Sequence, residues 1–334
     1  MPKRFQANII SSTAASPAGN FGDSSAGGVW SIGEQSIFKS ADDWPTAGLF
    51  AIALFAGGIT VSTRRNTIDQ ITISSTGNAT DFGDLSSERS LVAAGASNTR
   101  GVVGGGSEGS PNEINKIDYV TLRSAGNSSD FGDLTLARRA LGGTSSKTRA
   151  VFAGGSAPSA TNVIDFITIA TTGNASDFGD LTVATENGLL AAASPTRSLF
   201  AGGQDSGGLT ETIEFVTTAT EGNATDFGDL TSARREGAGC SSTTRALFGG
   251  SGNVIDYVTI ASAGNAIDFG DLTRSATAPA GASSLTRGVW AGGSNVGVID
   301  YVTIASTGNA VDFGDLTQGR QGLAGMSSNF GGNS

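Results

Sequence analysis

Residues 77–85 read Gly-Asn-Ala-Thr-Asp-Phe-Gly-Asp-Leu, and the last five of them decide the fold because they recur along the chain. The Asp-Phe-Gly-Asp-Leu motif occurs six times, at intervals of 49, 47, 49, 42 and 44 residues. The copies begin at Asp81, Asp130, Asp177, Asp226, Asp268 and Asp312. A period of this length is typical of architectures built from repeated supersecondary units. The chain is therefore a repeat protein.

Each copy contains the same succession of strand signals. A strand of small residues, as at 189–193, is followed by a Ser/Thr turn that ends in Arg. An apolar strand then closes on two glycines, as at 151–155, and the longest strand follows, as at 163–169, rich in β-branched and aromatic residues. A Gly-Asn turn, as at 173–174, leads into the Asp-Phe-Gly-Asp motif, because Gly and Asn adopt the positive φ angles of a tight turn. The sequence predicts six four-stranded units.

The two ends of the array predict a closed ring. The first copy starts at its second strand, near residues 53–58, and the last copy ends with a spare first strand at 322–326. Pairing of these two strands would complete the last blade and remove exposed sheet edges. We therefore expect an all-β, six-bladed β-propeller over residues 48–334, preceded by a short irregular N-terminal segment over 1–47. The alternatives are an open solenoid, and a seventh blade from residues 19–48, where Gly-Asn-Phe-Gly-Asp echoes the motif.

The unit resembles the kelch repeat. Gly154-Gly155 match its double glycine, residues 164–166 match its middle strand, Phe178 stands where the kelch Trp would be, and Leu181 matches the following Leu. The later Arg of the kelch unit is matched by Arg138, Arg234 and Arg320. The resemblance covers residues 49–328 and departs from kelch in the missing Trp and the shorter blades. It implies a kelch-like propeller.

Charged residues recur with the same period. One acid lies in each middle strand, and two more lie in each Asp-Phe-Gly-Asp motif, which we interpret as a turn. The middle-strand acids are Asp69, Asp118, Asp165, Glu214, Asp256 and Asp300. One series of arginines precedes the second strand, at Arg100, Arg149, Arg197, Arg245 and Arg287. A second series consists of Arg89, Arg138, Arg234 and Arg320, and the two remaining copies have Thr185 and Ala276 at this position. Because a residue needed in every blade is expected to be structural, we predict Arg–carboxylate pairs and Asp-to-backbone bonds.

Two alternatives give the recurrent acids a chemical role. Asp-x-Gly-Asp could bind Ca²⁺, which prefers carboxylate and carbonyl oxygens, although the closing Glu of an EF-type loop is missing. The motif also shares Asp-x-Gly with the Asp box of sialidase propellers, without its Trp. The chain has no histidine, the commonest general base and metal ligand. We therefore predict no metal, no cofactor and no enzymatic activity, and a glycosidase that uses carboxylates alone is the enzymatic alternative.

Composition excludes several partners. The net charge of −10 and the lack of a basic cluster argue against binding of nucleic acid. Residues 1–16 lack the apolar stretch of a secretory signal, and no run of residues is long enough to span a membrane, so no membrane insertion is expected. The single cysteine, Cys240, occupies a position that is Gly, Thr or Ala in other copies, which indicates a small buried residue.

The loops after the double glycines differ between copies. The first four are long and chemically unlike, whereas the last two are little more than turns. Rigid frames that hold variable loops commonly bind partners through those loops. The candidate ligand-binding residues are Arg64, Arg65, Glu108, Asn112, Glu113, Gln204 and Asp205.

Two of the three tryptophans lie in the N-terminal segment, where too few neighbours exist to bury them. We predict that the segment docks through Trp30, Ile32, Phe38 and Trp44 on a partner chain, and docking on the propeller itself is the alternative. Its Gly-Val-Trp-Ser and Trp-Pro stretches resemble a tract in structural proteins of tailed bacteriophages, and the Asn-Ala-Thr-Asp-Phe-Gly-Asp-Leu-Thr repeat resembles virion proteins of marine phages that infect cyanobacteria. The resemblance implies a virion component that is assembled in the host cytoplasm and present in multiple copies. Such a component would contact other virion proteins of the tail, neck or capsid, and it would bind a host-surface receptor or glycan. A cellular kelch-like adaptor for other proteins is the alternative.

Overall fold

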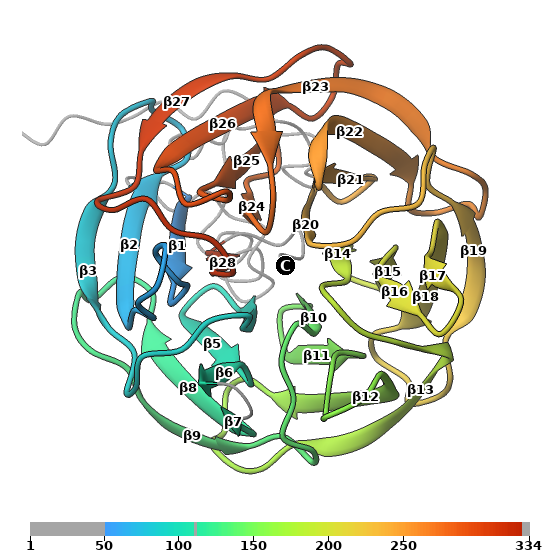
Figure 1. The fold of residues 1–334 in the computed structure, drawn as a ribbon, viewed down its shortest axis with the longest axis horizontal. Coiled ribbons are helices and arrows are strands. Elements are labelled where there is room, and N and C mark those ends of the chain that lie inside the picture. Colours follow the sequence, from blue (N-terminus) through green and yellow to red (C-terminus); the bar gives the residue numbers. More distant parts are fainter. Residues whose placement is uncertain (1–50, 110–111, 329–334) are drawn as a thin grey trace, which may run out of the picture. The chain divides into compact units, whose positions relative to one another are not determined.

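The computed structural model describes residues 51–109 and 112–328, which belong to one compact unit that begins at Ala51. These residues form an all-β structure without helices. Six four-stranded antiparallel sheets, the blades, surround a central axis, and each blade runs from an inner strand at the axis to an outer strand at the rim (Figure 1). The predicted six-bladed β-propeller is confirmed. The predicted boundary at residue 48 and the alternative seventh blade at 19–48 lie outside the described residues.

The strands of each blade are given from the axis outward. Blade 1 contains β28 (Ala324–Ser327), β1 (Ile52–Ala56), β2 (Thr67–Thr72) and β3 (Thr80–Asp84). Blade 2 contains β4 (Ala93–Ala96), β5 (Arg100–Gly104), β8 (Lys116–Thr121) and β9 (Ser129–Asp133). Blade 3 contains β10 (Gly142–Ser145), β11 (Arg149–Ala153), β12 (Thr161–Thr168) and β13 (Ser176–Thr185).

The other three blades follow the same order. Blade 4 contains β14 (Leu190–Ala193), β15 (Arg197–Ala201), β18 (Thr212–Thr217) and β19 (Thr225–Asp229). Blade 5 contains β20 (Gly237–Ser241), β21 (Arg245–Gly250), β22 (Gly252–Thr259) and β23 (Ile267–Ala276). Blade 6 contains β24 (Ala280–Ser283), β25 (Arg287–Ala291), β26 (Val298–Thr303) and β27 (Val311–Asp315).

The ring is closed by strands from the two ends of the described chain. Figure 1 shows β28, drawn red, on the axial side of β1, drawn blue. The two strands pair antiparallel from Ala53↔Ser327 to Ala56↔Ala324, as the partial copies predicted. β28 also contacts the inner strands of both neighbouring blades, β24 and β4. Six blades therefore complete the ring, and no sheet edge is left at the joint between the first and last copies.

The Asp-Phe-Gly-Asp motif is the outer strand of each blade and not a turn, which corrects our interpretation. In blade 1 it forms β3, where Phe82 is buried and Asp81 is exposed. Gly83 has a φ of +148°, and a Cβ there would lie 2.4 Å from the carbonyl oxygen of Gly126 in the next blade. The side chain of Asn127, in the same Gly-Asn turn, accepts a hydrogen bond from the backbone N–H of Asp84 at 3.1 Å. The motif is thus the surface on which the Gly-Asn turn of the next blade rests.

Buried ion pairs join four of the six linkers to the blades that they enter. Arg138, in the linker from blade 2 to blade 3, donates to the Asp165 carboxylate at 3.0 Å and to the carbonyl oxygens of Phe152 and Val163. Thr135 in the same linker donates its backbone N–H to Asp165 as well. The equivalent pairs are Arg89–Asp118, Arg234–Asp256 and Arg320–Asp69. The prediction of Arg–carboxylate pairs is confirmed for this series.

Two linkers lack the Arg, and both continue as strands. β13 and β23 contain ten residues each, whereas the outer strands of the other blades contain five. Thr185 and Ala276, which replace the Arg, are buried and lie opposite Thr161 and Gly252 in the middle strands. Backbone pairing therefore takes over from the ion pair at these two joints.

The second Arg series joins the blades near the Gly-Asn turns. Arg149 stacks on the Phe166 ring of its own blade, with 4.5 Å from Cζ to the ring centroid, and donates to the carbonyl oxygen of Ala219 in the next blade. Phe166 meets Phe178 of the outer strand edge-to-face. Blade 1 has Ile52 and Gln70 at the positions of the Arg and the aromatic residue. Cation–π and backbone contacts thus repeat in five blades and are replaced in the closing blade.

The inner strand of one blade packs by complementary residue size against the second strand of the next blade. Cys240 on β20 is fully buried, and a Cβ at Gly288 of the next blade would lie 2.3 Å from its Sγ atom. Met326 on β28 faces Gly101 in the same way, also at 2.3 Å. Burial raises the pKa of the Cys240 thiol well above its ordinary value. The prediction that Cys240 fills a structural position is confirmed, because its sulfur occupies the space that a glycine leaves.

Candidate functional site

The loops after the double glycines and the linkers between blades share one face of the ring, which we call the loop face. In five blades the loop hydrogen-bonds to the linker that precedes the inner strand of the same blade, and in blade 5 it hydrogen-bonds to the end of the outer strand β23. These backbone contacts join Ile59 to Gln321, Ser107 to Ser90, Ser156 to Arg139, Gln204 to Glu186, Ser251 to Ala276 and Ser294 to Thr277. These backbone hydrogen bonds therefore anchor the loops to the ring.

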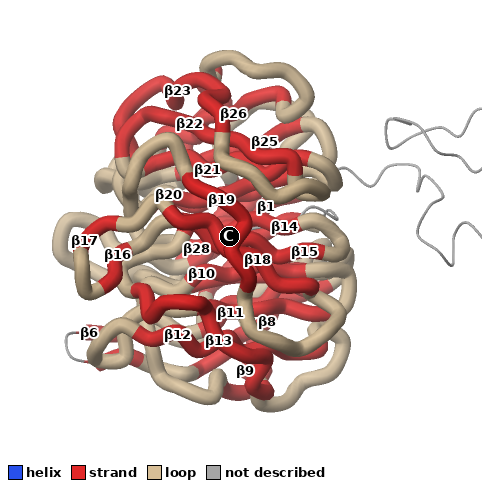
Figure 2. Tube along the Cα trace, turned by 90° about the vertical axis from the view of Figure 1, so that its right-hand side faces the viewer, coloured by secondary structure: helices blue, strands red, loops and turns tan. Residues whose placement is uncertain are grey.

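Two loops form additional hairpins. β6 (Ser107–Gly109) pairs with β7 (Asn112–Glu113) in blade 2, and β16 (Gln204–Asp205) pairs with β17 (Gly208–Leu209) in blade 4. Figure 2 shows β6 and the pair β16 and β17 on the same side of the ring. Leu209 at the end of the second hairpin is 51% exposed. The hairpins make the loop face uneven, which the unequal loop lengths predicted.

The predicted residues of the blade 4 loop have internal partners. Oδ1 of Asp205 accepts hydrogen bonds from the backbone N–H groups of Gly207 and Gly208 at 2.6 and 3.0 Å, so its carboxylate stabilises the hairpin turn. Oε1 of Gln204 accepts a hydrogen bond from Arg235, in the linker to blade 5. Both side chains therefore shape the loop face.

The predicted residues of blades 1 and 2 are divided between internal contacts and exposure. Glu113 forms an ion pair with Arg139 at 3.5 Å, and this pair joins the blade 2 hairpin to the next linker. Glu108 and Asn112 are exposed and share a hydrogen bond of 3.4 Å. Arg64 and Arg65 are half-buried, and the backbone N–H of Arg65 donates to the carbonyl oxygen of Gly58.

A closed circle of six backbone hydrogen bonds surrounds the axis at the centre of the loop face. Each N–H donates to the carbonyl oxygen of the equivalent residue one blade earlier, at 2.7–3.0 Å. The six members are Leu91, Ala140, Gly188, Glu236, Ala278 and Gly322. All six have positive φ angles, between 52° and 79°. Leu, Ala and Glu adopt this conformation at a cost, so the circle is a strained element that the ring holds in place.

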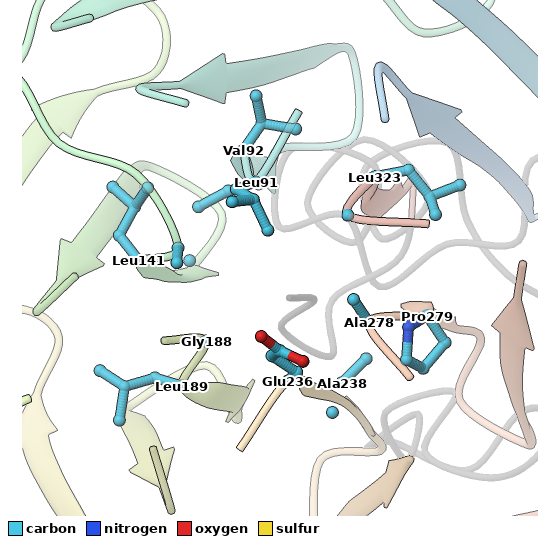
Figure 3. Close-up of a pocket in the computed structure, with 15 residues that line it drawn as sticks. Leu91, Val92, Leu141, Gly188, Leu189, Glu236, Ala238, Ala278, Pro279 and Leu323 are labelled. Carbon is cyan, nitrogen blue, oxygen red and sulfur yellow. The ribbon is translucent and has the colours of Figure 1, made fainter. Parts of the chain in front are cut away.

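This circle forms the rim of an axial pocket of about 50 Å³, lined by 15 residues from all six blades. Fourteen of them are Gly, Ala, Val, Leu or Pro, and the other is Glu236. Figure 3 shows the Glu236 carboxylate directed into the pocket, among Leu91, Leu141 and Leu189. Our sequence analysis missed this site. The signal was the acid at a linker position that is Leu, Ala or Gly in the other copies.

The two middle-strand acids in the blades whose linker Arg is replaced by Thr185 and Ala276, namely Glu214 and Asp300, are electrostatically distinct, and Asp300 has the charge of Arg274 nearby. Burial raises the pKa of Glu214 from its ordinary value of 4.5 to about 7, and the hydrogen bond from the Thr182 backbone N–H acts in the opposite direction. Burial raises the pKa of Asp300 as well, opposed by its hydrogen bonds from Thr273. Both acids therefore take up a proton more readily than ordinary carboxyl groups do.

The Asp-Phe-Gly-Asp carboxylates lie at the rim of the ring. The first Asp of each motif is exposed, as at Asp81, Asp130 and Asp177. Within residues 51–109 and 112–328, no group of three or more His, Cys, Asp or Glu side chains could hold a metal ion. The same residues contain no helix long and apolar enough to cross a membrane. Trp30, Ile32, Phe38 and Trp44 lie outside the described part of the chain.

No protein-family model matches the chain, and no curated protein is significantly similar to it. The kelch and virion resemblances therefore rest on the motifs alone. The fold itself, a six-bladed β-propeller, follows from the structure.

Proposed function

We propose that this protein is a binding protein that presents its loop face to a partner, and that it serves as a virion component of a tailed bacteriophage. The observation that carries the binding role is the coincidence of two projecting hairpins and an axial pocket on one face of a rigid ring. The virion assignment rests on the resemblance of the repeat and of the N-terminal stretches. In this role the N-terminal segment docks on the particle, and the loop face contacts a host-surface receptor or glycan as part of a tail or neck appendage or a capsid decoration.

Many copies on one particle would make weak individual contacts sufficient. Linked binding sites raise the effective concentration of each further contact, so overall attachment exceeds the affinity of one site. The negative charge of the chain, −10, keeps such copies from associating with one another. The proposed mechanism is recognition and not catalysis.

A matched pair of exposed leucines tests the loop face. Leu209 lies in the blade 4 hairpin and is 51% exposed, and Leu285 lies in the turn between β24 and β25, remote from the loop face, and is 47% exposed. Leu209→Ser should weaken adsorption of particles to host cells, and Leu285→Ser should not. Equal effects of the two substitutions would contradict the role of the loop face.

Deletion of residues 1–47 tests the docking role separately. The truncated chain should fold but no longer enter particles, as measured by quantitative mass spectrometry of purified virions. Incorporation at the normal level would refute N-terminal docking. If neither form of the chain enters particles and the loop face instead binds a host protein, the cellular adaptor is favoured. Release of sugar from a polysaccharide panel would favour the glycosidase.

A further inference from the structure

The axial pocket combines an apolar wall with one negative charge. Its only charged side chain, Glu236, comes from the linker between blades 4 and 5. The N–H groups of the rim residues are engaged in the circle of backbone hydrogen bonds, so they are not available to an anionic ligand. An apolar pocket with a few convergent polar groups is the usual form of a small-ligand site. Here the single polar group is a carboxylate, so the complementary ligand group is a cation.

The Glu236 carboxylate has no hydrogen-bond or ion-pair partner among residues 51–109 and 112–328. The adjacent cation, Arg235, is bound to Gln204 of the blade 4 hairpin. The next one, Arg234, is buried and paired with Asp256 at 2.6 Å. The charge of Glu236 is therefore available to a ligand that enters along the axis.

The volume of the pocket limits the cation to a small one. A cavity of about 10–15 Å³ holds one water, so the pocket of about 50 Å³ accommodates a group of a few non-hydrogen atoms. An ammonium nitrogen with two or three methylenes has this size. A guanidinium with its stem is larger and planar, and it needs more than one acceptor to engage its five N–H donors.

We propose that the axial pocket binds the protonated primary amine at the end of an unbranched alkyl chain, namely a lysine side chain of the partner protein. This assignment rests on the proposed function of the loop face. The ammonium group contacts Glu236, and the methylenes pack on Leu141, Leu189 and Leu323 at the wall. A strongly hydrated ammonium on an apolar stem requires such a combination of carboxylate and apolar wall.

The lysine contact would also orient the partner. The equivalent linker residues in the other five blades are Leu91, Ala140, Gly188, Ala278 and Gly322. The pocket is consequently charged on one side only, towards blade 5. A bound amine would be drawn to that side and would fix the rotation of the partner relative to the unequal loops.

The experiment uses the full chain with labelled Leu and Val methyl groups and n-propylammonium as the probe. Titration followed by NMR should give saturable shifts of the Leu141, Leu189 and Leu323 methyl signals. Glu236→Gln, which keeps size and backbone, should weaken binding about tenfold because it removes a charge-assisted contact. Glu236→Asp should retain part of the affinity, and Asp81→Asn, at an exposed acid on the outer strand β3 and outside the pocket, should bind like the wild type.

Three results would overturn the proposal. They are unsaturable or absent shifts at the three leucines, equal affinity of Glu236→Gln, and binding of n-propylguanidinium as strong as that of the amine. Unchanged thermal melting of Glu236→Gln confirms that a lost shift does not reflect unfolding. If Leu209→Ser weakens adsorption and Glu236→Gln leaves both adsorption and amine binding unchanged, the pocket assignment fails while the function of the loop face stands.

Discussion

Gly288 and Cys240 face each other between the strands of blades 5 and 6, and changing Gly288 to Ala tests how the inner strand of one blade packs against the second strand of the next. The new Cβ would lie 2.3 Å from the Cys240 Sγ atom, whereas non-bonded contacts are optimal at about 3.5–4.0 Å. To lengthen this contact from 2.3 Å to at least 3.5 Å, the two blades would have to separate by more than 1 Å at this point. Gly288 does not have a left-handed φ, so the backbone itself accepts Ala.

Overpacking of a well-packed core costs about 1–3 kcal/mol, and we expect Gly288→Ala to lower the free energy of unfolding by this amount. Cys240→Ala alone should cost about 1 kcal/mol for the lost buried sulfur. The double variant should be at least as stable as Cys240→Ala, because two alanines, Ala192 and Ala246, already occupy the equivalent positions one blade earlier. The expected coupling energy is therefore about 1–3 kcal/mol in favour of the pair.

Urea unfolding followed by tryptophan fluorescence and circular dichroism measures these differences. Trp290 lies in blade 6, fully buried in the same core cluster as Cys240, and reports the joint directly. Additive effects of the two substitutions, or a Gly288→Ala variant as stable as the wild type, would refute size complementarity between the two strands.

Three further predictions concern the other contacts between blades. Arg138→Met should cost about 3–5 kcal/mol because it leaves the Asp165 carboxylate buried without its cationic partner, and adding Asp165→Asn should recover more than half of the loss in urea unfolding. Because the pKa of Glu214 is raised in the folded state, the folded protein binds more protons than the unfolded chain between pH 4.5 and 7. The free energy of unfolding should therefore fall as the pH rises through this range, by about 2 kcal/mol after allowance for partial solvation. Glu214→Gln should remove most of this pH dependence, and an unchanged pH dependence in this variant would contradict the assignment. Gly83→Ala should lower the melting temperature more than Gly77→Ala, since both have φ near 150° but only a Cβ at Gly83 would meet atoms of a neighbouring blade, and equal effects would argue against that contact.

The global architecture could be predicted from the sequence because the repeat is nearly exact. The terminal half-copies specified the closing pair β1–β28, and the periodic Arg and acidic residues predicted the buried ion pairs. The Asp-Phe-Gly-Asp motif was misread, because Asp and Gly disfavour strands. Its strand conformation depends on the Gly-Asn turn of the next blade, which packs on Gly83 and its equivalents. Such a tertiary contact is not visible in local propensity.

The candidate site could be predicted only in part. The unequal loop lengths predicted an uneven loop face, which the hairpins confirm. Sequence cannot tell an exposed acid from one that already has an internal partner, and Asp205 and Glu113 stabilise the loops themselves. The axial pocket is assembled from six linkers that lie far apart in the chain and meet only after ring closure. Glu236 is therefore recognisable as a pocket residue only in three dimensions.

Hydrogen exchange of the β1 amides tests the closed six-bladed ring most directly. β1 lies between β28 and β2, as β11 lies between β10 and β12, so its amides should exchange as slowly as those of β11 in the full chain. In a chain that ends at Leu323, which lacks β28, the β1 amides should exchange much faster, while those of β11 should change less. Fast exchange of β1 in the full chain, or exchange of β1 that does not depend on residues 324–327, would contradict closure of the ring by the terminal strands.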